Sequence, residues 1–355
     1  MANLEASGCV RLFRGAGERI WRSVKQQKGG NKVKRELSLE FVRVTEAAAI
    51  AAARSVGRGD KNGTDGLAVD AMRKMFDTVN ISGKVVIGEG EMDEAPMLYI
   101  GEEVGAGGDE VDIAVDPVEG TNLVAKGQPG AIAVIAIAPR GCLLHAPDMY
   151  MDKIAVGPRA KGCIDINAPV EENLKRVAKA LKRDVDDVTV VVLDRPRHAE
   201  IIDRIRKAGG RIELITDGDV NPVVNVGIEG TGVHMYIGKG GAPEGVLGAA
   251  ALKCLGGDMQ AKLVPDNEEQ ARRCLEMGIC DLNRVLTIED MVKGDDCMFT
   301  CTAITESHLL HGVRFFGGGV RTHSVSMRYK TGTVRFVDTV HKLEDVPSKF
   351  SIKSN

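Results

Sequence analysis

Acidic residues follow a short apolar stretch in the sequence Ala-Val-Asp-Pro-Val-Glu-Gly-Thr, which begins at Ala114. Asp116 ends a predicted buried strand, and Pro117 predicts a turn there because its ring fixes φ. Glu119, three residues further on, can then return to the side of Asp116. Two carboxylates with a carbonyl between them supply part of the oxygen shell of a hard dication such as Mg²⁺ or Mn²⁺. The alternative is an ordinary turn with a capping acid.

Two further acidic segments have a similar relation to predicted elements. Glu89 lies between two glycines just after an apolar strand, which suits close approach to a metal ion, and Asp93 could bind a second ion or orient water. Asp65 precedes a predicted helix, and Lys61 nearby supplies a mobile cation. The alternatives are a solvated acidic loop for the first segment and ordinary helix capping for the second.

The coincidence of these acids at the ends of elements favours a metal site. No His or Cys accompanies them, and ligation by oxygen alone selects hard ions over zinc. The backbone N–H groups of Gly120 and Thr121 can receive a phosphate oxygen. The candidate ligands from this reasoning are Asp65, Glu89, Asp116 and Glu119.

The second half of the chain offers groups that bind phosphate and sugar. Arg195 and Arg197 follow a predicted strand and are held apart by a rigid proline, which suits a phosphate, although surface arginines that open a helix would look the same. Asp217 and Asp219 follow the next strand and could accept hydrogen bonds from sugar hydroxyls or could form a turn. Glu244 lies at the start of a helix and is a further metal ligand or an acid favoured by the helix dipole.

Histidine and cysteine give no comparable signal. The segment before Glu244 resembles an anion cradle, but it is not a Walker motif. His308 and His311 are three residues apart, but no nearby acid makes a site with them, so we interpret them as structural. The eight cysteines form no CxxC pair and indicate buried, reduced thiols in a reducing compartment.

Periodicity predicts the elements that position these residues. Helices are predicted over residues 37–56, 67–79, 171–181, 199–208 and 244–255, with a loop over 57–66. Strands are predicted over residues 85–87, 111–115, 131–138, 188–193, 211–215 and 233–237, and a hairpin over 322–327 and 333–340. The alternation beyond residue 165 predicts an α/β fold whose second part is a mostly parallel sheet, which binds ligands beyond the carboxyl ends of its strands.

Composition limits the classes of protein. A length of 355 residues corresponds to about two domains. The net charge of −3 and the aromatic content of 4% argue against binding of nucleic acid. The longest apolar run, residues 131–138, is too short for a membrane span.

The first 34 residues differ from the rest of the chain. Eight basic residues against two acidic ones give this segment a charge of +6. We expect a poorly ordered basic extension of a cytoplasmic protein; an organellar transit peptide is the alternative, although serine and threonine are scarce. The predicted division is an extension over 1–34, a metal-binding catalytic domain over 35–165 and a sugar-phosphate-binding α/β domain over 166–345, with the C-terminal hairpin packing on either.

Seven ordered motifs between about residues 35 and 341 resemble the class II fructose-1,6-bisphosphatases. The motifs are Gly-Arg-Gly-Asp-Lys-Asn at 57–62, Val-Ile-Gly-Glu-Gly-Glu at 86–91, Asp-Glu-Ala-Pro-Met-Leu-Tyr at 93–99, Asp-Pro-Val-Glu-Gly-Thr at 116–121, Asp-Arg-Pro-Arg-His at 194–198, Asp-Gly-Asp at 217–219 and Gly-Gly-Ala-Pro-Glu-Gly at 240–245. The fourth motif is also similar to a block of the lithium-sensitive phosphatases, which include inositol monophosphatase.

The resemblance implies a layered α-β-α-β-α sugar-phosphatase fold with two subdomains. It implies hydrolysis of the 1-phosphate of fructose 1,6-bisphosphate in gluconeogenesis, two or more Mn²⁺ or Mg²⁺ ions, and a homodimer or homotetramer. Metal ligands by position are Asp65, Glu89, Asp116, Glu119 and Glu244, and residues important for turnover are Lys61, Asp93 and Thr121. Substrate would lie on Glu119, Gly120, Thr121, Tyr150, Arg195, Pro196, Arg197, Asp217, Gly218, Asp219 and Gly241.

Other functions remain open at this point. Sedoheptulose 1,7-bisphosphate or an inositol phosphate is an alternative substrate, and the arginine pair favours a bisphosphate over a monophosphate. A non-catalytic binder of sugar phosphates is a more distant alternative, because such a protein would carry basic groups around the phosphate rather than this set of acids.

Overall fold

The computed structural model describes residues 33–88, 98–277, 279 and 281–342. The chain divides into two units, Met1–Lys32 and Val33–Asn355, and every described residue belongs to the second. Glu89 and Asp93 lie outside the described residues, so the predictions made for them stay predictions.

The first sheet has eight strands in the described part of the chain, and only β1 and β3 pair in parallel. Its order is β12 (Arg314–Phe316), β13 (Gly319–Arg328), β11 (Met298–Ala303), β4 (Ile132–Pro139), β3 (Asp109–Glu119), β1 (Ile81–Ile87) and β2 (Glu103–Val104), and β14 (Thr333–Lys342) pairs with β13. The predicted hairpin is therefore confirmed, and it joins the first sheet. Its turn consists of a 3₁₀ helix, Tyr329–Thr331, followed by Gly332 with φ of 58°.

The second sheet has six described strands and is mixed. Its order is β10 (Leu286–Thr287), β9 (Asp258–Val264), β5 (Tyr150–Val156), β8 (Met235–Gly241), β6 (Thr189–Leu193) and β7 (Arg211–Ile215). Only the pairs β8–β6 and β6–β7 are parallel, so the prediction of a mostly parallel sheet was wrong. The antiparallel strands β5 and β9 lack a continuous apolar run; β9 alternates buried and half-buried residues, which gives a weak signal in the sequence.

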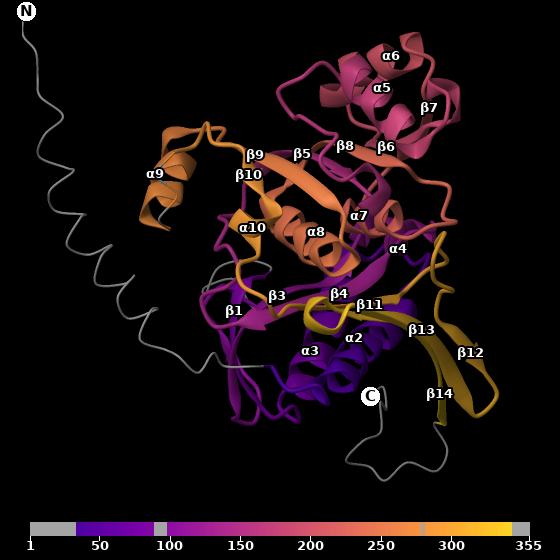
Figure 1. Cartoon of the computed structure of the whole chain (residues 1–355). Coiled ribbons are helices and arrows are strands. Elements are labelled where there is room, and N and C mark those ends of the chain that lie inside the picture. The colour runs from indigo at the N-terminus through magenta and orange to yellow at the C-terminus, as the bar shows by residue number, and fades with distance from the viewer. Residues whose placement is uncertain (1–32, 89–97, 278, 280, 343–355) are drawn as a thin grey trace, which may run out of the picture. The chain divides into compact units, whose positions relative to one another are not determined.

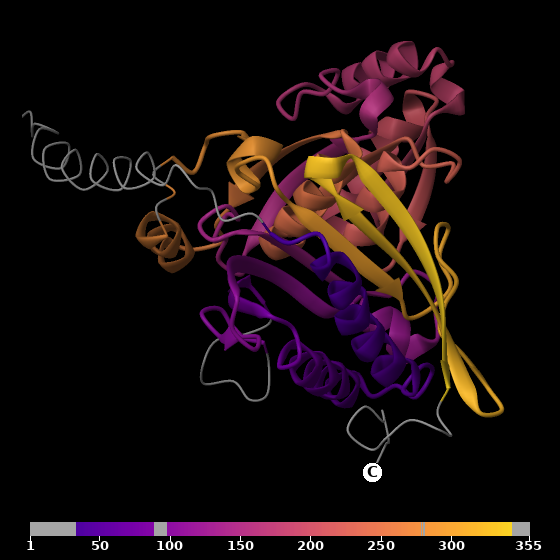
Figure 2. The same ribbon diagram turned by 60° about the horizontal axis from the view of Figure 1, so that its bottom comes forward.

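Helices cover both faces of each sheet, so helices and sheets together form five layers (Figure 1). The helices α2 (Leu37–Ala53) and α3 (Lys61–Phe76) pack on one face of the first sheet, which Figure 2 shows from below. Between the sheets lie α7 (Val220–Gly227) and α8 (Ala242–Leu255), and beyond the second sheet lie α5 (Val170–Leu181) and α6 (Ala199–Lys207). Three separate apolar cores fill the spaces between layers, so the layered α-β-α-β-α prediction is confirmed.

The central helix α8 is buried along almost its whole length. Its sequence is apolar on every side, as a helix between two sheets requires. The exceptions are Glu244 in its first turn and Lys253, whose Nζ donates to Glu289 and to the carbonyl of Val292. The described part of the chain also contains shorter helices: α4 (Thr121–Lys126), α9 (Glu268–Glu276) and α10 (Ile288–Met291), and the 3₁₀ helices Pro158–Ala160, Val185–Asp187 and Pro196–His198.

Two predicted boundaries near the acidic motifs were wrong. Helix α3 starts at Lys61 rather than after Asp65, because the Asp60 side chain caps it by accepting a hydrogen bond from the Gly63 N–H at 2.9 Å. Asp65 therefore lies inside the helix and caps nothing. Strand β3 does not end at Asp116: it continues through an irregularity in its pairing as far as Glu119.

Three general expectations have different outcomes. Among the described helices, none is both long and apolar enough to span a membrane. The described cysteines are free thiols; Cys254, Cys274, Cys297 and Cys301 are buried, whereas Cys142 and Cys163 are half-buried. The domain boundary near residue 165 stays a prediction, and β5, which precedes it, lies in the second sheet.

Asp296→Ala should lower the free energy of unfolding by about 3–5 kcal/mol, because it leaves a buried arginine without its partner. Asp296 accepts from Arg328 Nε at 3.0 Å and from Nη2 at 2.8 Å, and the two side chains are 1% and 5% exposed. Denaturant titration measures the change. Asp295→Ala is the matched control, since Asp295 is 88% exposed and should cost about 0.5 kcal/mol or less. Equal losses in both variants would contradict the assignment.

Candidate functional site

An acidic cavity of about 370 Å³ lies where strands of both sheets end. Strands β3, β6 and β8 reach it with their carboxyl ends, and helices α4, α7 and α8 begin beside it. Such strand ends are where α/β sheets bind ligands. The predicted residues among its lining are Asp116, Glu119, Gly120, Thr121, Tyr150, Arg195, Arg197, Asp217, Gly218, Asp219, Gly241 and Glu244. We refer to it as the acidic cavity.

Three other predicted residues are absent from the lining of the acidic cavity: Lys61, Asp65 and Pro196. The Thr121 hydroxyl donates to Asp65 Oδ1 at 3.1 Å, which connects α3 with the start of α4. Burial raises the pKa of Asp65, while the Thr121 hydrogen bond and the charge of Lys61 act in the opposite direction. Pro196 opens the 3₁₀ helix between the two arginines. The structure thus brings the beginning of α3 to the same site as Thr121.

Three carboxylates in the acidic cavity each keep an oxygen that has no partner among the described residues. Glu119 accepts from the Val220 N–H at 3.0 Å through Oε1, but its Oε2 is buried and unpartnered. Oδ1 of Asp219 and Oε2 of Glu244 are likewise buried without a partner. Buried carboxylate oxygens without donors are costly unless a cation satisfies them.

Burial raises the pKa values of Glu119 and Glu244. Burial, reinforced by the nearby charges of Asp219 and Glu244, raises the pKa of Glu119 to about 8. Burial and Asp219 raise the pKa of Glu244 to about 6, although Lys153 acts in the opposite direction. Raised pKa values in neighbouring carboxylates are typical of a site that has too little positive charge nearby to balance them.

The donor set fits a hard cation, but the described residues do not form a closed metal cage. Within them, no three His, Cys, Asp or Glu side chains stand at ligating spacing. The unpartnered oxygens of Glu119 and Glu244 are nevertheless the hard oxygen donors that Mg²⁺ and Mn²⁺ accept. Asp116 also lines the cavity, and its Oδ1 accepts from the Val118 N–H at 2.9 Å, which is the capping contact that the alternative interpretation expected.

The two arginines of the acidic cavity are held by different groups. Arg197 donates from Nε and Nη2 to the Lys239 carbonyl at 3.0 and 2.8 Å, and its guanidinium lies 4.9 Å from the centre of the Tyr150 ring. Buried His198 fixes the same strand end, because its Nε2 accepts from the Lys239 N–H at 2.8 Å. Arg195 lies 3.3 Å from Asp217 Oδ1. These contacts orient the guanidinium groups before any ligand binds.

Asp217 and Asp219 are engaged by the protein itself. Asp217 Oδ2 accepts from the Asn122 N–H at 3.0 Å and from its side-chain amide at 2.8 Å. Asp219 Oδ2 accepts from the Tyr236 hydroxyl at 2.8 Å and lies 2.6 Å from Lys153 Nζ. Most of the described bonds of these two carboxylates thus go to other residues of the site. Their predicted contact with sugar hydroxyls stays a prediction.

Sequence reasoning missed Lys153, Tyr236 and Asn122. Lys153 is the most informative of them, since its side chain is only 1% exposed and pairs with Asp219 inside the second sheet. A lysine between buried positions of the strand Tyr-Met-Asp-Lys-Ile-Ala-Val is a signal that could have been noticed. Tyr236 and Asn122 carry no such signal, because their roles depend on residues far away in the chain.

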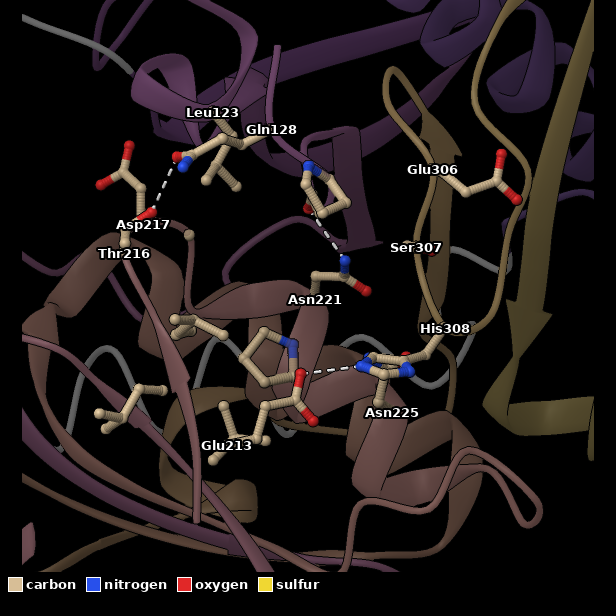
Figure 3. A pocket seen from close by; sticks show the side chains of 17 residues that line it. Leu123, Gln128, Glu213, Thr216, Asp217, Asn221, Asn225, Glu306, Ser307 and His308 are labelled. Carbon is tan, nitrogen blue, oxygen red and sulfur yellow. Dashed lines mark hydrogen bonds and ion pairs between the residues drawn. The ribbon is translucent and has the colours of Figure 1, made fainter. Parts of the chain in front are cut away.

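A neighbouring cavity of about 390 Å³ shares Asp217 and Gly218 with the acidic cavity (Figure 3). In it, His308 Nε2 lies 2.8 Å from Glu213 Oε1 (Figure 3). His311 Nδ1 lies 2.6 Å from Glu306. Each histidine thus has an acid beside it: Glu306 is close in the sequence, whereas Glu213 comes from the distant strand β7. Both ion pairs are exposed and stabilise the fold only weakly.

Comparison with known proteins identifies the family. The profile of the family described as "Bacterial fructose-1,6-bisphosphatase, glpX-encoded" matches residues 35–341. A protein of Synechococcus sp. (strain JA-2-3B'a(2-13)), named D-fructose 1,6-bisphosphatase class 2/sedoheptulose 1,7-bisphosphatase, is 49% identical over 86% of this chain and 95% of its own. A protein of the same name from Synechococcus elongatus is 48% identical over 88% of this chain and 98% of its own. These matches make the chain a hydrolase of phosphate monoesters. It belongs to the family of bacterial class II fructose-1,6-bisphosphatases.

When EDTA has removed divalent cations, Glu119→Gln should lose less stability than the wild-type protein as the pH rises. The folded protein holds the pKa of Glu119 at about 8, above its ordinary value of 4.5, so the folded state retains a proton that the unfolded chain has released. The stability that this group contributes is present below the lower pKa and is lost as the pH rises through the higher one. We therefore expect the wild-type Tm to fall between about pH 5 and pH 8.

Thermal unfolding at several pH values measures this effect, and Glu119→Gln should fall less steeply than wild type. Glu276→Gln, on the exposed surface of α9, is the control and should behave as wild type. Identical slopes for all three proteins would show that Glu119 is ordinarily ionised in the fold.

Proposed function

We propose that the acidic cavity hydrolyses the 1-phosphate of fructose 1,6-bisphosphate to fructose 6-phosphate and phosphate, with bound Mn²⁺ or Mg²⁺. The observation that carries this proposal is the meeting of Glu119, Asp219 and Glu244, each with an unpartnered buried oxygen, in one cavity with two fixed arginines. The acids suit cations, and the guanidinium groups suit a second phosphate. The activity named for the relatives supports the same conclusion.

Asp65, Asp116, Glu119 and Glu244 would hold the cations, together with Glu89. When bound, the cations neutralise the charge of the phosphate oxygens and favour attack by water. The remaining steps belong to side chains of this chain. The Thr121 hydroxyl, fixed by Asp65 at 3.1 Å, orients the attacking water. Lys61 stabilises the negative charge that develops, and Asp93 accepts a proton or organises the ligands.

The distal phosphate binds Arg195 and Arg197 in this proposal. Arg197 is anchored through two of its nitrogens to the Lys239 carbonyl, so Nη1 remains for a phosphate oxygen. Binding energy from this remote phosphate aligns the reacting one. Tyr150, 39% exposed beneath the Arg197 guanidinium, supplies a flat wall for the sugar, whose hydroxyls bind Asp217, Gly218, Asp219 and Gly241.

Sedoheptulose 1,7-bisphosphate is the second candidate substrate, since the names of the two Synechococcus relatives join both activities. The decisive experiment measures phosphate release from fructose 1,6-bisphosphate, sedoheptulose 1,7-bisphosphate and inositol monophosphate, with and without Mn²⁺. Release from the bisphosphates only, and only with the metal, supports the proposal. Release from none of them would leave a non-catalytic binder. We also propose that the protein is cytoplasmic and that it forms a homodimer or homotetramer.

Asp116→Ala should lower metal-dependent phosphate release about 100-fold or more while the fold remains intact. The reason is that Asp116 lines the cavity at the carboxyl end of the central strand β3. Steady-state kinetics with circular dichroism as a folding check makes the measurement. Asp70→Ala, at an exposed position of α3, serves as the control. Normal turnover in the Asp116 variant refutes the metal assignment.

Replacing both Arg195 and Arg197 with Gln should selectively weaken the use of bisphosphates. Wild-type enzyme should prefer fructose 1,6-bisphosphate over fructose 1-phosphate in kcat/KM, and the double variant should lose about tenfold or more of this preference. The exposed Arg272→Gln on α9 should keep it. An unchanged preference in the double variant would place the distal phosphate elsewhere.

A further inference from the structure

A second, basic cavity of about 500 Å³ lies at the opposite ends of the strands that form the acidic cavity. Thr189 opens β6, Arg211 opens β7 and His234 directly precedes β8, and all three line it. The acidic cavity, by contrast, lies at the ends of β6 and β8 that carry Leu193 and Gly241. The two cavities share no lining residue, so the second is a separate site. We refer to it as the basic cavity.

Arginines from three different elements converge on the basic cavity. Arg159 lies in the 3₁₀ helix Pro158–Ala160, Arg183 follows α5, and Arg211 begins β7. Arg159 donates to the Leu181 carbonyl at 3.3 Å, and Arg211 to the Asp187 carbonyl at 2.9 Å. These bonds to the backbone orient two guanidinium groups while leaving other N–H groups for a ligand.

The positive charge of the basic cavity is only partly balanced. Glu229 is the one acid among its lining residues; it is 77% exposed and 3.8 Å from Arg159. Asp187, outside the lining, lies 3.5 Å from Arg211. The backbone N–H of Arg183 donates to the Ala178 carbonyl, but its guanidinium group forms neither a hydrogen bond nor an ion pair with any described residue. Three arginines against one lining acid leave a charge of +2, and like charges that converge in this way favour an anion.

His234 adds a neutral hydrogen-bond donor. Its Nδ1 accepts from the Thr189 N–H at 3.0 Å, which places its proton on Nε2. Burial and the charges of Arg183 and Arg211 lower the pKa of His234 and so favour its neutral form. The rest of the lining is largely apolar and includes Leu181, Ile228 and Val233. A ligand that fills this cavity therefore has an anionic end and an apolar body.

We propose that the basic cavity is a non-catalytic binding site for a small organic phosphate. Its dianionic phosphate would bind Arg159, Arg183 and Arg211, whose forked N–H groups match phosphate oxygens and whose positive charge attracts them. The apolar body would lie against Leu181, Ile228 and Val233. The site is independent of the proposed hydrolysis, because no residue of the acidic cavity takes part.

Calorimetric titration with phenylphosphonate tests this proposal. The probe carries a phosphate-like dianion on a flat apolar ring and cannot be hydrolysed. EDTA in the buffer removes divalent cations that could bind it in the acidic cavity. We expect one site on the wild-type chain and a loss of affinity of about tenfold or more in Arg183→Gln and in Arg211→Gln. The matched control Arg176→Gln, on an exposed face of α5, should bind as wild type.

Thermal unfolding and turnover without phenylphosphonate verify that each variant is folded. Unchanged affinity in both pocket variants would overturn the proposal. Loss of binding in Arg197→Gln with retention in Arg183→Gln would place the anion in the acidic cavity and would also overturn it. Tighter binding of citrate than of phenylphosphonate would contradict the phosphate class.

Discussion

The site depends on acidic side chains that are brought together in a poorly solvated space. Glu119 and Asp219 are 2% and 4% exposed, and the only lysine that lies within bonding distance of them in the described chain is Lys153, which pairs with Asp219. One ammonium group cannot balance several carboxylates, so burial raises the pKa of Glu119 instead. The fold therefore carries an electrostatic cost that a bound cation would relieve. This cost is the physical basis of the proposed chemistry.

Three layers of the fold hold these acidic side chains in place: the first sheet, the layer of α7 and the second sheet. The central strand β3 of the first sheet delivers Glu119, and the start of α7 fixes its carboxylate through the Val220 N–H. The second sheet supplies Lys153 and Tyr236 from β5 and β8, both directed at Asp219. Close approach also requires small residues: a Cβ added at Gly240 would lie 1.9 Å from Asp219 Oδ2. Neither sheet alone could build the cavity.

The sequence could predict the site better than it could predict the elements beside it. The apolar runs gave the correct ends of β1, β6 and β7, because buried strands and polar loops contrast sharply in composition, whereas β3 and β8 continue past their predicted ends. The start of α3 was misplaced because Gly63 and Gly66 have low helix propensity, while the Asp60 cap that offsets them is a single side-chain contact. The Lys153–Asp219 pair joins residues far apart in the chain, so only the fold reveals it. The same holds for the three arginines of the basic cavity.

The central claim is that the carboxylates of the acidic cavity hold divalent cations against a phosphate ester. Diffraction from crystals of the Thr121→Ala variant, which should hydrolyse its substrate slowly, grown with Mn²⁺ and fructose 1,6-bisphosphate and recorded at the manganese absorption edge, tests it most directly. The account predicts anomalous peaks within about 2.0–2.3 Å of oxygens of Glu119 and Glu244, with the 1-phosphate beside them. Manganese bound only elsewhere, with the sugar phosphate still in the cavity, would contradict it.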